Sequence, residues 1–161
     1  MEDLRAITIK PSIAELSEKG RGLVDEGRRI AKKVNCFDFV PSNYELAWRT
    51  LDSIPRGRLC EWGSGLGIVT GLAELLGFDA FGIEMDSDLC RQSRQLLASQ
   101  QLKAPIFNED YFQSELRADY YYVYCWPSVL EATESLFGKI ATKDSLLLIC
   151  YGQDDIRGFM T

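Results

Sequence analysis

The sequence contains no histidine, and its five cysteines form no Cys-x-x-Cys pair. These absences exclude a zinc site built from thiolates and imidazoles, and they exclude a histidine general base. No apolar run approaches the roughly 20 residues that a membrane span needs, and the start, MEDLRAITIK, lacks the apolar core of a secretory signal. We therefore expect a cytoplasmic protein without a metal site or a membrane partner, whose scattered cysteines are mostly small buried residues.

Basic residues are also fewer than acidic ones. The chain has 18 Lys and Arg residues against 24 Asp and Glu, which gives a net charge of −6. Because nucleic-acid affinity depends largely on neutralising phosphates, this composition argues against a nucleic-acid partner. Five basic residues do gather in one segment, and we interpret them as the solvated face of a helix: Arg21, Arg28, Arg29, Lys32 and Lys33.

Two helices are predicted in the first third of the chain, over residues 11–34 and 43–54. Each begins with a serine and a glutamate in capping-box spacing, Ser12–Glu15 and Ser42–Glu45. The stretch between them, FDFVP, is expected to be extended, because the residue before a proline disfavours the helical conformation.

Strands alternate with helices beyond residue 55. The predicted strands are RLCEW (58–62), DAFGIE (79–84), APIFN (104–108), YYYVYCW (120–126) and SLLLICY (145–151). Helices are predicted between them, over residues 67–77, 86–102 and 127–141. This alternation indicates an α/β protein with a mostly parallel sheet covered on both faces. We expect residues 1–161 to form a single domain, with 1–54 as an N-terminal helical segment and lid and 55–161 as the core.

A glycine-rich loop, CEWGSGLG, lies between the first of these strands and the next helix. Gly63, Gly65 and Gly67 let the backbone approach a ligand closely, and the helix N-terminus offers free N–H groups. A dinucleotide fingerprint needs a further glycine where this chain has Ile68. Glu61 would also repel a pyrophosphate and attract a cationic group. A dinucleotide-binding protein is therefore the weakest of the alternatives that we consider.

Acidic residues follow the next two predicted strands. Glu84 in GIEMD ends the second strand, where a carboxylate can accept hydrogen bonds from ribose hydroxyls. Asp110 in NEDYF follows the third strand and can accept from an adenine amine, and Tyr111 or Phe112 can stack on or flank the adenine ring. The loop and both acids lie at the carboxyl ends of parallel strands, where open α/β sheets bind ligands.

Residues 38–151 resemble the class I S-adenosylmethionine-dependent methyltransferases, through EWGSGLG, GIEMD, EDYF and YCWP. The resemblance implies a three-layer, Rossmann-like core with strand order 3-2-1-4-5 and S-adenosylmethionine as cofactor. It places Glu61 at the methionine end of the cofactor, Glu84 at the ribose, and Asp110 and Tyr111 at the adenine. The further cofactor contacts that it implies are Gly63, Ser64, Gly65, Gly67 and Met85.

The segment FVPSNYE is similar to one that closes over the cofactor in small lysine-directed members of this family. The resemblance therefore implies a lid that contains Phe39, Ser42 and Tyr44, with Ser42 as a cofactor contact.

The methyl acceptor is expected at the end of the fourth strand, and Tyr124, Trp126 and Pro127 are the predicted catalytic residues. Methyl transfer depends on positioning, because the cofactor carries the reactivity, so the lack of histidine is no obstacle. Aromatic faces hold cationic amines, which favours a protein lysine, another amine or a small molecule as acceptor. YCWP also lacks the leading polar residue of the motif that amino-methylating enzymes of nucleic acids carry here.

The family core usually ends in an antiparallel hairpin, and this chain stops ten residues after the fifth predicted strand. We therefore expect the hairpin to be absent and SLLLICY to lie at an open edge of the sheet. Either a second copy covers that edge in a homodimer, or the IRGFM tail or the first helix folds over it. The missing strands leave a second function open, a non-catalytic S-adenosylmethionine-binding module or subunit.

Overall fold

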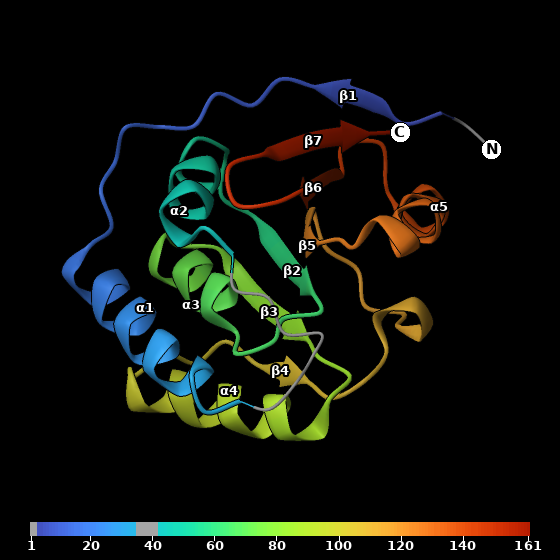
Figure 1. Ribbon diagram of the computed structural model, residues 1–161. Coiled ribbons are helices and arrows are strands. Elements are labelled where there is room, and N and C mark those ends of the chain that lie inside the picture. Colours follow the sequence, from blue (N-terminus) through green and yellow to red (C-terminus); the bar gives the residue numbers. More distant parts are fainter. Residues whose placement is uncertain (1–2, 35–41) are drawn as a thin grey trace.

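A seven-stranded sheet forms the centre of the computed structural model, which describes residues 3–34 and 42–161. The strand order is β1-β7-β6-β5-β2-β3-β4 (Figure 1). The strands are Arg5–Ile7 (β1), Arg58–Trp62 (β2), Asp79–Ile83 (β3), Ile106–Phe107 (β4), Tyr120–Tyr124 (β5), Leu146–Cys150 (β6) and Ile156–Met160 (β7). Because β2 lies between β5 and β3, the loop that follows β2 lies between these two strands at their carboxyl ends.

Helices cover both faces of this sheet, which confirms the predicted three-layer arrangement (Figure 1). On one face lie α1 (Glu18–Ala31), α2 (Tyr44–Asp52), α3 (Ile68–Leu75) and α4 (Ser87–Ser99). On the other lie α5 (Leu130–Ile140) and two short 3-10 helices, η1 (Tyr111–Gln113) and η2 (Pro127–Val129). Alternate residues of each strand point to opposite faces of the sheet, and each face has its own hydrophobic core. Tyr122 packs in the first core, beside α1 to α4, and Tyr121 packs in the second core, beside α5.

The five predicted strands pair in parallel in the order β4-β3-β2-β5-β6, which confirms the expected order 3-2-1-4-5. Only one strand, β7, follows β6 in the described residues, so the two strands that end the family core are not both present, as predicted. Of the predicted ways to cover the edge of SLLLICY, the tail is the one that the structure has. The tail IRGFM forms β7, antiparallel to β6, with Cys150 opposite Ile156. The turn between them closes through a hydrogen bond from the Tyr151 N–H to the Asp155 carbonyl, 2.9 Å.

The N-terminus adds a strand that the sequence did not indicate. β1 pairs antiparallel with β7, with Ala6 opposite Phe159, and takes the outermost position of the sheet. The segment after β1 packs so closely that a Cβ on Gly158 would lie 2.6 Å from Ile9 Cδ1. Since β7 and β1 occupy the edge of β6, the open edge that motivated a homodimer does not exist. The division of the chain at residue 54 stays a prediction.

The first helix begins later than predicted. α1 starts at Glu18, with Ser17 as its N-cap, because the Ser17 hydroxyl accepts from the Gly20 N–H at 3.0 Å. The predicted Ser12–Glu15 capping box was wrong: the Ser12 N–H donates to the Arg49 carbonyl, which holds this stretch outside a helix.

The second helix, α2, is capped by Asn43 and not by the predicted Ser42. The Asn43 side chain accepts from the Leu46 N–H at 3.1 Å. The predicted extended segment FDFVP and the lid residue Phe39 lie outside the described residues. Among the helices that the structure describes, none has the length and apolar character required to cross a bilayer.

Candidate functional site

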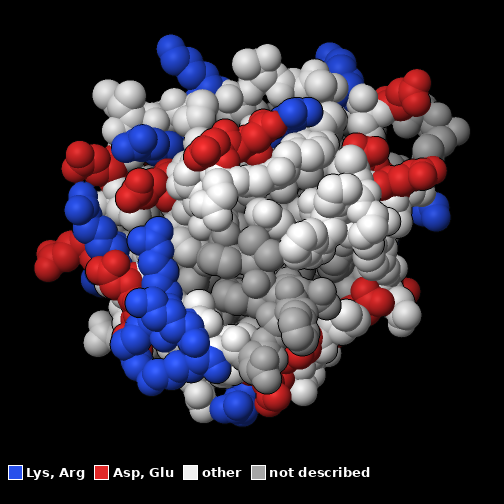
Figure 2. Space-filling view, in the orientation of Figure 1, with Lys and Arg blue, Asp and Glu red and all other residues white. Residues whose placement is uncertain are grey.

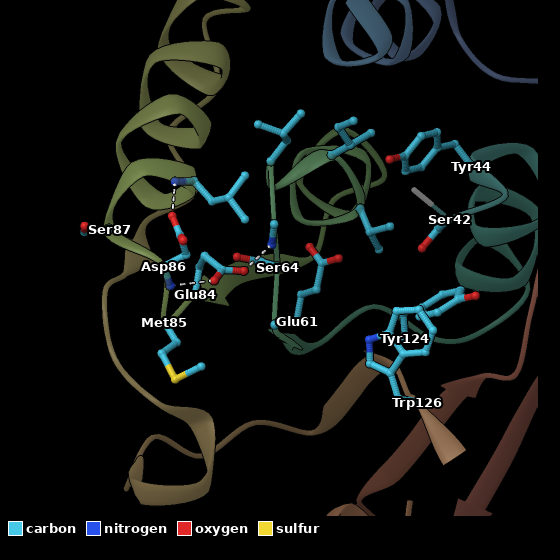
Figure 3. Close-up of a pocket in the computed structure, with 16 residues that line it drawn as sticks. Ser42, Tyr44, Glu61, Ser64, Glu84, Met85, Asp86, Ser87, Tyr124 and Trp126 are labelled. Carbon is cyan, nitrogen blue, oxygen red and sulfur yellow. Dashed lines mark hydrogen bonds between the residues drawn. The ribbon is translucent and has the colours of Figure 1, made fainter. Parts of the chain in front are cut away.

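A cavity of about 490 Å³ opens at the carboxyl ends of β2, β3 and β5 (Figure 3). It brings together most of the predicted site residues: Ser42, Tyr44, Glu61, Gly63, Ser64, Gly65, Glu84, Met85, Tyr124 and Trp126. The sequence reasoning did not assign six other residues that line it: Leu66, Ile68, Val69, Asp86, Ser87 and Leu89. Of these, Asp86 and Ser87 carried a signal as the start of a predicted helix. The volume suits a small organic ligand.

The glycine loop reaches the cavity because three of its residues adopt left-handed backbone conformations. The φ angles are 66° at Gly63, 58° at Gly65 and 73° at Gly67. L-residues with a side chain rarely tolerate these angles, so this path requires glycine at alternate positions. The Gly67 N–H then donates to the Ser64 carbonyl at 2.7 Å, which closes the turn before α3.

Gly82 lets the loop lie directly against the next strand, and the sequence reasoning missed this residue. The Ser64 N–H donates to the Ile83 carbonyl at 2.9 Å. A Cβ on Gly82 would lie 2.8 Å from both Ser64 side-chain atoms and from Ile106 Cδ1. Only glycine at this strand position therefore leaves room for Ser64.

Glu84 connects the glycine loop to the start of α4. One carboxylate oxygen accepts from the Gly65 N–H and the other from the Asp86 N–H, both at 2.8 Å (Figure 3). Asp86 in turn caps α4 through the Leu89 N–H at 2.9 Å. Each carboxylate oxygen has a second acceptor site, and the residue lines the cavity, so Glu84 can still accept from a ligand hydroxyl.

Glu61 places a second carboxyl group in the same cavity, almost fully buried at 6% exposure. One of its oxygens accepts from the Thr70 hydroxyl at 2.7 Å and from the Thr70 N–H at 3.0 Å. The pKa of Glu61 is raised to about 8, and burial is the main cause. The hydrogen bonds from Thr70 lower this pKa, whereas the nearby charge of Glu84 raises it further. A cationic ligand group would compensate the buried charge and lower this pKa.

Aromatic side chains enclose the other end of the cavity (Figure 3). Tyr124 and Trp126 pack edge to face, with ring centroids 6.1 Å apart at 75°. Tyr44 from α2 is 4% exposed, and burial raises the pKa of its phenol, with a further contribution from the charge of Glu61. Tyr44 is therefore a neutral hydroxyl group at physiological pH and not a base.

Two of the predicted adenine contacts do not line the cavity. The Asp110 carboxylate accepts from the Phe112 N–H at 3.0 Å and caps η1. Tyr111 packs in the second core, where its ring stacks on Trp62 with centroids 5.2 Å apart. Its hydroxyl lies 3.2 Å from that of Thr133. Cofactor contact by these two residues stays a prediction.

Two further predicted residues also lie outside the cavity lining. Gly67 is the N-cap residue of α3, and a Cβ there would lie 3.2 Å from Ile106 Cδ1, so its position serves the turn and its packing. Pro127 begins η2, immediately after Trp126.

No family model and no curated protein sequence matches the chain. Solved structures do match its fold. A methyltransferase from Geobacter sulfurreducens superposes with a TM-score of 0.67 at 15% identity, over 87% of this chain and 90% of that one. The chain has the class I methyltransferase fold.

Two other structures with this methyltransferase fold were solved with a small molecule. An RNA methyltransferase from Salinibacter ruber, in complex with S-adenosyl-L-homocysteine, matches with a TM-score of 0.56 at 18% identity, over 64% of this chain and 78% of that one. The glycopeptide N-methyltransferase MtfA, complexed with sinefungin, matches with a TM-score of 0.54 at 16% identity, over 71% of this chain. This chain spans only 56% of MtfA.

Proposed function

We propose that this protein binds S-adenosylmethionine in the cavity and transfers its methyl group to an amine of a protein lysine or a small molecule. The observation that carries the proposal is the pair of carboxyl groups in one cavity, with Glu84 hydrogen-bonded to the glycine loop and Glu61 buried beside it. A ligand that combines a cationic amine with a ribose fits these two groups.

The residues of the cavity suit the parts of this cofactor. Glu61 would hold the ammonium group of the methionine end, which offsets the cost of its burial. The buried Ser64 hydroxyl has no hydrogen-bond partner among the described residues, so it is available to a polar ligand atom. Glu84 would accept from the ribose, with Met85 at the adenosine end. Asp110 and Tyr111 are the residues that we propose at the adenine.

When bound, S-adenosylmethionine supplies an electrophilic methyl group on a sulfonium. The chain's own residues then position the acceptor and exclude water. Tyr124 and Trp126 present aromatic faces that hold an amine, and Pro127 begins η2 directly after Trp126. Enclosure between Tyr44 and Tyr124 lowers the pKa of an amine, which favours the neutral, nucleophilic form. Ser42 and Tyr44 add hydroxyl groups that orient it.

Calorimetric titration with S-adenosylmethionine and S-adenosylhomocysteine tests the cofactor, with NAD as a control. We expect micromolar binding of the first two and none of NAD. The Gly65→Arg variant should lose this binding, because residue 65 lines the cavity and an arginine there would fill it and strain the left-handed loop. Circular dichroism checks that the variant is folded. Tight binding by a folded Gly65→Arg protein would overturn the site.

Release of S-adenosylhomocysteine in the presence of lysine peptides and small amines then tests methyl transfer. Binding without release for any amine would indicate the alternative function, a non-catalytic cofactor-binding module. The structure removes the main argument for that alternative, because β7 and β1 fill the strand positions that the sequence left empty.

A further inference from the structure

A cluster of basic side chains lies at the C-terminal end of α1 and the adjoining start of α4. We call it the α1 basic surface, and its members are all exposed: Arg28, Arg29, Lys32, Lys33 and Arg91. Figure 2 shows basic side chains gathered on this part of one face, although the whole chain carries a net charge of −6.

The α1 basic surface adjoins residues of the cavity lining at two points. The Arg28 guanidinium lies 5.9 Å from the centroid of the Tyr44 ring, and Tyr44 lines the cavity. A smaller hollow of about 190 Å³ is lined by Lys33 and Arg91. Its other lining residues include Asp86, which the main cavity shares. The hollow also contains the Asp88 carboxylate, so the cations border the cavity lining without forming part of it.

Acidic neighbours compensate only part of this positive charge. Arg29 pairs with Glu26, and Arg91 lies 3.6 Å from Asp88. Arg28, Lys32 and Lys33 have no ion-pair partner among residues 3–34 and 42–161. Arg28 to Lys33 extends for about 8 Å along the helix axis, so these cations can contact more than one phosphate of a strand.

The surroundings distinguish a nucleic-acid strand from a membrane. The apolar side of α1 is buried, with Leu23 at 0% and Val24 at 2% exposure, so the helix has no free apolar face to insert into a bilayer. Trp126 lines the same cavity as Tyr44 and is 43% exposed. Trp126 lies across the cavity from Asp86, so the cations and the exposed ring lie on opposite sides of one cavity (Figure 3). Single strands use this combination, with phosphates on cations and a base stacked on an aromatic ring.

We propose that the α1 basic surface docks the phosphates of a single nucleic-acid strand at the cavity mouth, with an unpaired base stacked on Trp126. The proposal goes beyond the proposed function, because docking is a property of the surface whether or not methyl transfer occurs. The net charge of −6 does not oppose this docking, because it is a sum over the whole molecule, whereas a phosphate interacts mainly with charges within about 10 Å.

Fluorescence anisotropy with a labelled single-stranded RNA of about 15 nucleotides tests the docking. We expect a micromolar Kd at about 50 mM salt, weakening with salt at a log–log slope near −2, as three released counterions predict. Lys32→Glu/Lys33→Glu should weaken binding by about 10-fold or more and flatten the slope. Lys139→Glu/Lys143→Glu makes the same charge change around α5, on the opposite face of the sheet, and should stay within about 2-fold.

Trp126→Ala separates stacking from charge. It should weaken RNA binding by about 10-fold with the salt slope unchanged. The proposal is overturned if wild-type protein does not bind RNA at low salt, if both charge-reversed pairs weaken binding equally, or if polyglutamate of equal charge binds as tightly as RNA. Circular dichroism confirms that each variant is folded. Titration of Lys32→Glu/Lys33→Glu with S-adenosylhomocysteine shows separately whether the cofactor site is intact.

Discussion

Glu61 carries a carboxyl group that the fold places inside the cavity, with Thr70 as its hydrogen-bond donor. Its pKa is raised from 4.5 to about 8, so the folded protein favours the protonated form. The stability that this proton supplies is fully present below the unfolded pKa and is lost as the pH rises through about 8. The same group therefore affects both stability and ligand binding near neutral pH.

Glu61→Gln should remove this pH dependence, because glutamine keeps an acceptor for Thr70 but does not ionise. We expect the free energy of unfolding of the wild-type protein to fall between pH 6 and pH 8.5, and that of the variant to fall less. Urea unfolding at several pH values measures both. Parallel curves for the two proteins would contradict a raised pKa at Glu61.

Ligand affinity should show the opposite trend. A cationic ligand favours ionised Glu61, so its binding to the wild-type protein below pH 8 releases a proton. Affinity for the ligand should therefore rise by up to about 10-fold for each unit of pH increase below pH 8. Calorimetry with S-adenosylhomocysteine in buffers of different ionisation enthalpy measures the proton. In Glu61→Gln, affinity should be at least about 10-fold weaker and independent of pH. Proton release that persists in the variant would assign it to another group.

Gly82 and Gly138 form a matched pair for the packing of the glycine loop. Gly82→Ala would place a methyl group 2.8 Å from Ser64 and Ile106, whereas a Cβ on Gly138 has nothing within 4 Å. We expect Gly82→Ala to destabilise the protein by about 1–3 kcal/mol and to weaken cofactor binding. Gly138→Ala, inside α5, should be neutral or stabilise it by up to about 1 kcal/mol. Thermal and chemical unfolding compare the two, and equal effects would contradict the close approach at Gly82.

β1 shows how a three-residue element completes the sheet. Its partner β7 would otherwise be an edge strand with apolar residues, and Ile7 and Ile9 cover Gly158. The N-terminal segment therefore has a structural function in the same sheet that carries the site.

Removal of residues 1–10 should expose the β7 edge. We expect a lower melting temperature and a shift toward larger species in size-exclusion chromatography at high concentration, because unpaired edges promote association. Full-length protein at the same concentrations is the control. A truncated protein with unchanged melting temperature and elution would show that β1 contributes little.

At the scale of the whole molecule, the site joins elements that are far apart in the sequence. Glu61 lies in β2 and Tyr44 begins α2, whereas Glu84 comes directly after β3 and Trp126 comes just after β5. A ligand that contacts all of them stabilises the folded state only, so its effect extends to global unfolding.

S-adenosylhomocysteine at about 100 times its Kd should raise the melting temperature by roughly 5–10 °C. Thermal scanning measures this shift, with NAD as the control ligand and Gly65→Arg as the control protein. A similar shift with NAD, or in the Gly65→Arg variant, would contradict specific binding in the glycine-loop cavity.

The sequence by itself determined the five parallel strands and most of the cavity, and the family resemblance implied the order of the strands. These features depend on residues that are close together in the sequence: the spacing of glycines, runs of β-prone residues, and acids directly after strands. The residues from Glu61 to Gly65 and Glu84 were therefore recognisable without coordinates. The tertiary structure alone decided the rest. β1 is too short to show a periodic pattern, β7 contains Arg157 and Gly158, and the cap of α1 at Ser17 depends on Ser12 pairing with Arg49. Burial at Glu61 and the gathering of Arg28 and Lys33 beside the cavity are likewise long-range effects, because desolvation and charge clustering depend on which elements pack together.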